Sequence, residues 1–279
     1  MDFRKAQRKK AKLRLGITGP AGSGKTYGAL LVAFGLGGKI ALIDTENGSG
    51  DLYSALGDYD IGYIKAPYTV EKYLQAIHEA ENAGYDIIII DSLSHAWSGE
   101  GGLLDLQGSL TDTKYRGNSY AAWRQVTPQH NKLIDAMLSS SAHIIATMRS
   151  KTDYVQVENE RGKTEIRKVG LAPVQREGMD YEFGVVFDLS VNHLVTVSKD
   201  RTSIFDGNVF SLSQETGKIL RKWLDEGLDT GQRNKLYKKY VEKFAGDTAQ
   251  AQEFMLGITE GRSPKDWTAE DIQNLEAGL

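Results

Sequence analysis

The sequence predicts an α/β fold with a mainly parallel, twisted sheet, an antiparallel extension and a small helical C-terminal region. Three successive patterns along the 279 residues carry this prediction. Short apolar runs alternate with helical stretches as far as about residue 150, paired β-rich runs follow, and the chain turns helical from about residue 213. We therefore expect a basic arm at 1–12, a core at 13–212 and a helical region at 213–279.

Five strands and three helices are expected in the alternating part of the chain. A short, apolar, β-rich run marks each strand, namely 13–17, 40–43, 61–64, 87–90 and 143–147. The helices expected between them are 25–36, 69–83 and 118–140. Strands that alternate with helices in this way pair in parallel, because each crossover returns the chain to the same edge of the sheet.

Two pairs of β-rich runs follow and predict hairpins. Residues 154–157 and 164–169 flank a polar turn, and residues 181–189 and 193–199 are joined by a tight connection. A hairpin joins antiparallel strands, so these pairs cannot continue a parallel crossover pattern. We expect them to form the antiparallel extension of the sheet. Near the C-terminus, Thr268 and Asp271 resemble a capping box that opens a last short helix.

Composition and charge narrow the classes of function. The net charge of −3 gives no overall case for nucleic-acid binding, so any such surface must be local. The absence of cysteine excludes disulfides, thiolate metal sites and cysteine nucleophiles. No apolar run is long enough to span a membrane, and the basic N-terminus lacks the apolar segment of a secretory signal. We expect a cytoplasmic protein without a membrane partner.

The segment from Gly19 to Thr26 carries the strongest functional signal, because it fits the pattern G-x-x-x-x-G-K-[ST]. It lies between an expected strand and an expected helix, so its N–H groups and the helix N-terminus would form an anion site. In this pattern the lysine, Lys25, reaches the outer phosphates, and the Thr26 hydroxyl binds Mg²⁺. We therefore expect the chain to bind ATP with Mg²⁺. The expected nucleotide-binding residues are Gly19, Pro20, Ala21, Gly22, Ser23, Gly24, Lys25, Thr26 and Tyr27.

Carboxylates at the ends of two further strands complete a candidate hydrolytic site. Asp91 follows four consecutive isoleucines, so it should emerge at the carboxyl edge of the sheet and support the metal. Asp44 and Glu46 follow the strand at 40–43, and either would be placed to polarise the attacking water. The spacing alone leaves the choice between these two open. The histidines show no metal spacing, and we expect a structural role for His95.

The order of these motifs resembles that of RecA-like ATPases, the group of RecA, the archaeal and eukaryotic recombinases and the DnaB and KaiC relatives. The run from Ile43 to Glu46 is similar to the Ile-Asp-x-Glu pattern of the recombinases, which implies that Glu46 is the catalytic carboxylate. Asp91 resembles their second acidic motif. Thr147 and Arg149 stand where the group places a polar sensor, often a glutamine. The missing glutamine leaves open whether either residue couples DNA binding to hydrolysis.

Lys199 and Arg201 end a predicted strand, and their spacing makes both side chains project in the same direction. RecA-like oligomers and DnaB helicases carry a similar pair of cations, which reach the γ-phosphate of the neighbouring subunit. The resemblance therefore implies that Lys199 and Arg201 act in trans, in a homo-oligomer that is a ring or a filament. A pair of solvated charges on an edge strand is the alternative.

The stretch from about 12 to 205 resembles the phage-encoded single-strand annealing and recombination ATPases of the fourth Sak type. Segments such as 118–123 and 179–183 add to the likeness in motif order. The resemblance implies ATP-dependent work on single-stranded DNA, by annealing or strand pairing, in the cytoplasm of a bacterial host. Two rival functions are a nucleotide-gated assembly module that binds a replication or recombination protein, and a helicase motor of the DnaB or KaiC kind.

The resemblance also implies where DNA would bind, namely at 93–118, expected as a mobile loop, and at the hairpin of 150–178. The candidate contacts are Lys114, Arg116, Lys151, Arg161, Lys163, Arg167 and Lys168. Cations beside aromatic residues suit a single strand. Acidic residues in the hairpin dilute its field, so a solvated hairpin of mixed charge is the alternative. The helical tail at 231–279 is a candidate site for a partner such as a single-strand binding protein.

Overall fold

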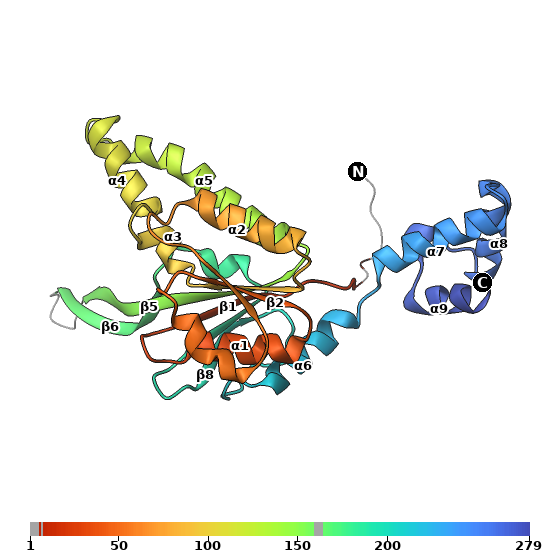
Figure 1. Cartoon of the computed structure of the whole chain (residues 1–279), viewed down its shortest axis with the longest axis horizontal. Helices are drawn as coiled ribbons and strands as arrows, with labels where there is room; N and C mark the ends of the chain where they lie inside the picture. Colours follow the sequence, from red (N-terminus) through yellow and green to blue (C-terminus); the bar gives the residue numbers. More distant parts are fainter. Residues whose placement is uncertain (1–5, 7, 159–163) are drawn as a thin grey trace. The chain divides into compact units, whose positions relative to one another are not determined.

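The computed structural model describes residue 6 and residues 8–158 and 164–279. Two compact units make up the chain (Figure 1). The larger unit spans 12–220, and the smaller unit combines the N-terminal residues up to 11 with residues 221–279. Among the described residues, no helix has the length and apolarity needed to cross a lipid bilayer.

The larger unit is built on an eight-stranded sheet, which confirms the predicted fold class. Seven strands follow the order β3-β2-β4-β5-β1-β7-β8, and β6 pairs with β5. All neighbours along this order pair in parallel except β7 and β8, and β5 and β6 also pair in antiparallel fashion. The strands are β1 Arg14–Gly19, β2 Ile40–Asp44, β3 Asp60–Tyr63, β4 Ile87–Asp91, β5 His143–Glu158, β6 Thr164–Pro173, β7 Val185–Leu189 and β8 Val195–Asp200.

Helices cover both faces of this sheet, with α2, α3 and α5 on one face and α1 on the other (Figure 1). The larger unit contains α1 Lys25–Leu36, α2 Val70–Asn82, α3 Ser94–Ser98, α4 Leu103–Thr113, α5 Ser119–Ser139, the 3₁₀ segments η1 Ser49–Leu56 and η2 Met179–Glu182, and most of α6 Gln214–Asp225.

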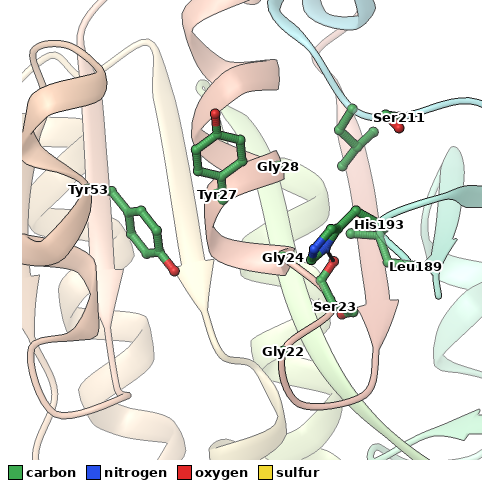
Figure 2. Close-up of a pocket in the computed structure, with 10 residues that line it drawn as sticks. Gly22, Ser23, Gly24, Tyr27, Gly28, Tyr53, Leu189, His193 and Ser211 are labelled. Carbon is green, nitrogen blue, oxygen red and sulfur yellow. Dashed lines mark hydrogen bonds between the residues drawn. The ribbon is translucent and has the colours of Figure 1, made fainter. Parts of the chain in front are cut away.

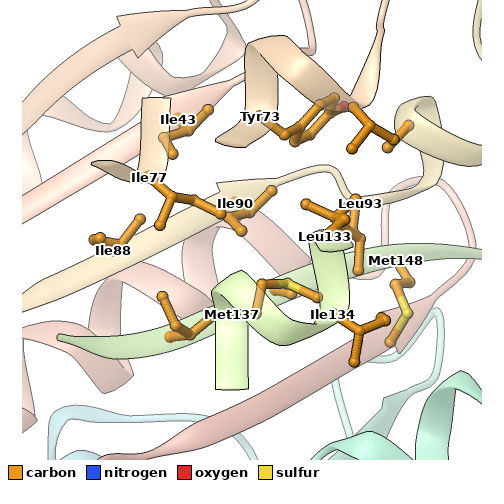
Figure 3. Packing of buried hydrophobic residues seen from close by; sticks show 14 of the residues in the cluster. Ile43, Tyr73, Ile77, Ile88, Ile90, Leu93, Leu133, Ile134, Met137 and Met148 are labelled. Carbon is orange, nitrogen blue, oxygen red and sulfur yellow. The ribbon is translucent and has the colours of Figure 1, made fainter. Parts of the chain in front are cut away.

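The isoleucines of β4 explain why it lies at the centre of the sheet. All four are buried, as the run of four apolar residues requires of a strand covered on both faces. Because side chains alternate between the faces, Ile88 and Ile90 share one core with Tyr73 of α2 and Leu133 of α5 (Figure 3). This packing fixes the carboxyl end of β4, and with it Asp91.

Three predicted elements differ from the structure. The strand expected at 181–189 begins only at Val185, because Met179–Glu182 forms the 3₁₀ segment η2. The strand expected at 143–147 does not end there, because β5 continues to Glu158 and leaves the sheet to pair with β6, from Ser150 opposite Pro173 onwards. The polar residues of this extension are tolerated because it is an antiparallel ribbon outside the covered sheet. The segment 93–118 is not a plain loop, since it forms α3 and α4.

Helix α1 is held against α6 by glycines on both helices. A Cβ added at Gly35 would lie 1.9 Å from the carbonyl oxygen of Gln214, and one added at Gly217 would lie 2.1 Å from that of Val32. Only glycine permits this approach, so the two helix backbones are in direct contact. The contact fixes the helix that follows the Gly19–Thr26 segment.

The smaller unit has a hydrophobic core of its own. Its helices are α7 Thr230–Lys243, α8 Thr248–Ile258 and α9 Ala269–Ala277, with the 3₁₀ turn η3 Pro264–Asp266. Tyr240, Met255 and Trp267 are among the buried side chains that these elements share. The predicted capping box is confirmed, since Thr268 and Asp271 exchange hydrogen bonds at the start of α9.

The described end of the basic arm belongs to this smaller unit. The Lys10 N–H donates to the Leu228 carbonyl at 3.0 Å, and the Leu228 N–H donates to that of Arg8 at 2.9 Å. The Arg8 guanidinium lies 4.1 Å from the centre of the Trp223 ring and pairs with Glu226 at 3.0 Å. Arg8 and Lys10 of the arm therefore make contacts with residues of the smaller unit. Residues 1–5 and 7 of the arm lie outside the described residues.

Candidate functional site

The loop between β1 and α1 has the backbone of an anion site. Gly22 and Gly24 adopt positive φ angles of 77° and 83°, a conformation that lets the chain turn tightly into the helix. The Lys25 ammonium donates to the Pro20 carbonyl at 2.9 Å and so folds over the loop. Burial lowers the pKa of Lys25 below its usual value, although the charges of Asp91 and Glu46 oppose this shift.

Asp91 lies against this loop, at the carboxyl end of β4. It is 2% exposed, and its two oxygens accept hydrogen bonds from the hydroxyls of Thr26, at 2.6 Å, and Thr147. Burial raises the pKa of Asp91, while these two hydroxyls lower it. The structure thus brings together Thr26, Asp91 and the predicted sensor residue Thr147.

The oxygens of Thr26 and Asp91 fit a magnesium site. They are hard ligands, and Mg²⁺ in proteins is commonly bound by one or two side chains, with water and substrate phosphates filling the other positions. The phosphate loop lies beside them, so a nucleotide would complete the set. The part of the chain that the structure describes contains no cluster of three His, Cys, Asp or Glu side chains suited to a metal. Thr26 and Asp91 suit a site that shares its ion with the nucleotide.

The two carboxylates after β2 have different environments. Asp44 is 1% exposed, and its oxygens accept hydrogen bonds from the backbone N–H groups of Glu46 and Gly50. Its carboxylate therefore shapes the turn that follows the strand. The Glu46 side chain is 23% exposed and lies among the side chains that surround Asp91 and Lys25. Of the two, Glu46 is the carboxylate that is partly exposed beside Asp91 and Lys25.

Arg149, which lies on β5, holds the carboxylate of Glu46. Its Nε donates to Glu46 Oε1 at 2.9 Å, and its Nη2 pairs with Oε2. The Ser92 hydroxyl donates to Oε1 at 3.0 Å. Burial acts to raise the pKa of Glu46, but the hydrogen bonds and charge of Arg149 outweigh it, with help from His95 and Ser92, and the pKa lies below its usual value. Glu46 is thus kept ionised, the form in which it accepts a proton.

His95 braces the same carboxylate, and its place was not expected from the sequence. Its Nδ1 lies 2.7 Å from the Thr45 hydroxyl, and its Nε2 lies 4.0 Å from Glu46 Oε1. The Tyr68 ring stacks on it with centroids 4.7 Å apart. Burial lowers the pKa of His95, although the charge of Glu46 opposes this shift. Only its sequence position after Asp91 hinted at this site.

A cavity of about 470 Å³ opens beside the loop, on the outer side of α1 (Figure 2). Tyr27 lines it together with Tyr53 of η1, with ring centroids 6.0 Å apart. His193 lines the opposite side, and its Nδ1 lies 3.1 Å from the Ser23 carbonyl. The walls are mostly apolar and adjoin the predicted phosphate site, so the cavity suits the base of a nucleotide. Tyr27 was predicted from the sequence as a nucleotide-binding residue, whereas Tyr53 and His193 were not.

The structure does not bring Lys199 and Arg201 to the loop of their own chain. Strand β8 runs antiparallel to β7, with Asp200 opposite Val185, which in turn lies beside Leu15 at the start of β1. Gly19 and the loop are at the other end of β1, roughly 13 Å away at the usual rise per residue. Lys199 donates instead to the carbonyl oxygens of Asp180 and Tyr181, at 3.0 and 2.6 Å.

The predicted DNA residues fall on two projections. Lys114 and Arg116 lie in the connection between α4 and α5. Lys151 is exposed on the part of β5 that pairs with β6, and Arg167 and Lys168 lie on β6. Arg161 and Lys163 lie outside the described residues.

The fold and the loop define a protein with a phosphate-loop NTPase core. Residues 11–233 match the AAA domain family, and because the match covers most of the chain, the protein belongs to that family. It therefore carries an ATPase-type domain that binds nucleotide, usually with Mg²⁺. None of the curated proteins compared with the chain matches it.

Proposed function

We propose that the protein is a RecA-like ATPase that acts on single-stranded DNA in phage-type homologous recombination, by annealing or strand pairing. One observation carries the ATPase part: Thr26 of the loop is hydrogen-bonded to Asp91, and the ionised Glu46 carboxylate lies beside them. Phosphate, metal and water would meet at this edge of the sheet. The order of motifs supports the RecA-like assignment.

Each side chain has a role that follows from its position. The loop N–H groups and Lys25 bind the phosphates, and Thr26 and Asp91 hold Mg²⁺, which supplies charge stabilisation on the phosphate oxygens. Glu46 orients the attacking water and accepts its proton. Arg149 and His95 position Glu46, and Thr147 orients Asp91. The purine base of the nucleotide would lie in the cavity beside Tyr27.

Lys199 and Arg201 act on the nucleotide of a neighbouring copy in this proposal. Their position, at the other end of the strands from the loop of their own chain, supports an action on another chain. A contact that joins two different edges is head-to-tail, so it generates a ring or an open filament.

The continuity of β5 supports an effect of DNA on the site. The same strand carries Thr147 and Arg149 at the site and Lys151 at the base of the projecting ribbon. The Arg149 N–H is also tied to the Ser94 hydroxyl at 2.9 Å, next to the turn that follows Asp91. A single strand bound along the ribbon would therefore act directly on the residue that holds Glu46.

A strand-annealing assay tests the DNA part of the proposal. Two complementary oligonucleotides, one with a fluorophore and one with a quencher, are mixed with the protein, Mg²⁺ and ATP. We expect faster annealing than with the Lys25→Ala variant or without nucleotide. Annealing at the uncatalysed rate would contradict the proposal, and ATP-dependent separation of a preformed duplex would favour the helicase.

A second candidate function is supported by the smaller unit. Its helices have a hydrophobic core of their own, so they form a separate module that is available for a role other than nucleotide binding. In that case nucleotide would gate assembly with a replication or recombination protein, such as a single-strand binding protein. ATP-dependent binding of that protein, with no effect of DNA on annealing or turnover, would favour this alternative.

A further inference from the structure

Helices α4 and α5 form a hairpin that projects from the sheet (Figure 1). Its tip is the connection from Lys114 to Asn118, with the first turns of α5. No Asp or Glu occurs from residue 113 to residue 134, whereas this stretch contains Lys114, Arg116, Arg124 and Lys132. Asp112, near the end of α4, is the acidic residue next to this stretch, so the tip keeps a net positive charge, which attracts phosphate.

The β5–β6 ribbon has a more nearly balanced charge. Its five cations between 151 and 168 are accompanied by Asp153, Glu158, Glu160 and Glu165. The positive electrostatic potential at the ribbon, which would attract a phosphate backbone, is correspondingly weaker. Of the two projections, the α4–α5 tip is the better electrostatic match for a nucleic acid.

Tyr120 adds a second observation at the tip. Its side chain is 88% exposed, the highest value among the large hydrophobic residues that the structure describes as exposed. No hydrogen bond or ring contact involves its side chain within the described residues. Arg124 follows it by four positions on α5 and is also exposed, so the two side chains share one face of the helix. An unpaired aromatic ring beside cations is what a stacked base requires.

The other aromatic residues of this region are engaged in packing. The Tyr115 hydroxyl donates to Gln125 Oε1 at 3.0 Å, and Lys114 donates to the same oxygen at 3.2 Å. Trp123 stacks on Trp97 with centroids 5.7 Å apart. Tyr120 is therefore the ring at the tip that is free to receive a ligand.

We propose that the α4–α5 tip binds single-stranded nucleic acid, with a base stacked on Tyr120 and backbone phosphates on Arg116 and Arg124. This inference rests on the proposed function and assigns it a surface. A duplex would supply phosphates, but its bases are already stacked on one another. The ring of Tyr120 thus selects a single strand.

The test is the affinity of the full-length protein for a fluorescent oligothymidine and for a labelled duplex, measured by anisotropy at several salt concentrations. We expect Tyr120→Ala to weaken oligothymidine binding roughly tenfold, with a much smaller effect on the duplex, and Tyr120→Phe to restore it. Arg124→Gln should reduce the slope of log affinity against log salt by about one phosphate contact. Tyr181→Ala, which removes another exposed tyrosine (72%), is the matched control.

The outcomes separate this inference from the proposed function. If the wild-type protein binds oligothymidine and Tyr120→Ala binds it equally well, the tip is not the site, and the proposed function stands. An equal loss for oligothymidine and duplex would overturn the stacking role. If the wild-type protein binds no single strand at all, the proposed function fails and the inference fails with it. Unchanged thermal unfolding and DNA-free ATP turnover of Tyr120→Ala show that the variant is folded.

Discussion

Replacement of Glu46 by glutamine is expected to lower kcat for ATP hydrolysis by at least a hundredfold, while the affinity for ATP stays close to that of the wild-type protein. Glutamine keeps the shape of the side chain and can still accept the hydrogen bond from Ser92, but it cannot take a proton from water. The nucleotide contacts of the loop and Asp91 are left in place. The measurements are single-turnover hydrolysis and the binding of a fluorescent ATP analogue.

Asp44→Asn is the matched control for this prediction. The Asp44 oxygens accept backbone N–H groups, so the substitution should lower the melting temperature and reduce turnover much less than Glu46→Gln. The assignment of Glu46 would be wrong if Glu46→Gln hydrolysed ATP normally. It would also be wrong if Asp44→Asn abolished hydrolysis in a protein of unchanged stability.

Replacement of Arg201 by alanine is expected to reduce turnover about a thousandfold, the usual scale for an arginine that stabilises a transferring phosphoryl group. Arg201 lies at the other end of the strands from the loop of its own chain. An intact Arg201 of another chain should therefore restore the lost turnover. A mixture of Arg201→Ala with the equally inactive Lys25→Ala should regain activity in about a quarter of its sites, where an intact loop meets an intact arginine in a head-to-tail contact.

Lys218→Ala, which removes an exposed cation of α6, serves as the control and should leave turnover unchanged. Normal turnover by Arg201→Ala would identify Lys199 and Arg201 as solvated edge-strand charges. A mixture that stays inactive, although each variant alone forms oligomers of wild-type size, would contradict a site shared between chains.

Local patterns predicted the elements that hold the candidate site. The glycines and Lys25 of the loop, and Asp91 after four isoleucines, are defined by a few consecutive residues, so the sequence revealed them. The choice between Asp44 and Glu46 needed the structure as well as a family resemblance. Only the contacts of Asp44 with the backbone of its turn show what separates the two carboxylates.

Contacts between distant segments could not be predicted in this way. His95 and Tyr68 meet beside Glu46, and Arg149 reaches it across more than a hundred residues of sequence. The close approach of Gly35 and Gly217 leaves no local sign either, because each glycine lies within an otherwise ordinary helix. These features arise from the pairing order of the strands and from helix packing, which no local window contains.

The extension of β5 shows a limit of a different kind. Arg149, Ser150 and Lys151 are polar, and in a buried parallel strand they would end the run. The strand continues because it leaves the covered sheet at this point and pairs only with β6. A polar sequence is compatible with such a ribbon, so polarity alone was a poor guide to the end of the strand.

The most direct test of the account is ATP turnover with Mg²⁺, measured without DNA, with single-stranded DNA and with duplex DNA, and with Lys25→Ala as the blank. We expect turnover in the wild-type protein that single-stranded DNA raises severalfold, that duplex raises less, and that Lys25→Ala lacks under every condition. Tight ATP binding with turnover indifferent to every DNA would contradict the account and point to a nucleotide-gated module whose target is a protein.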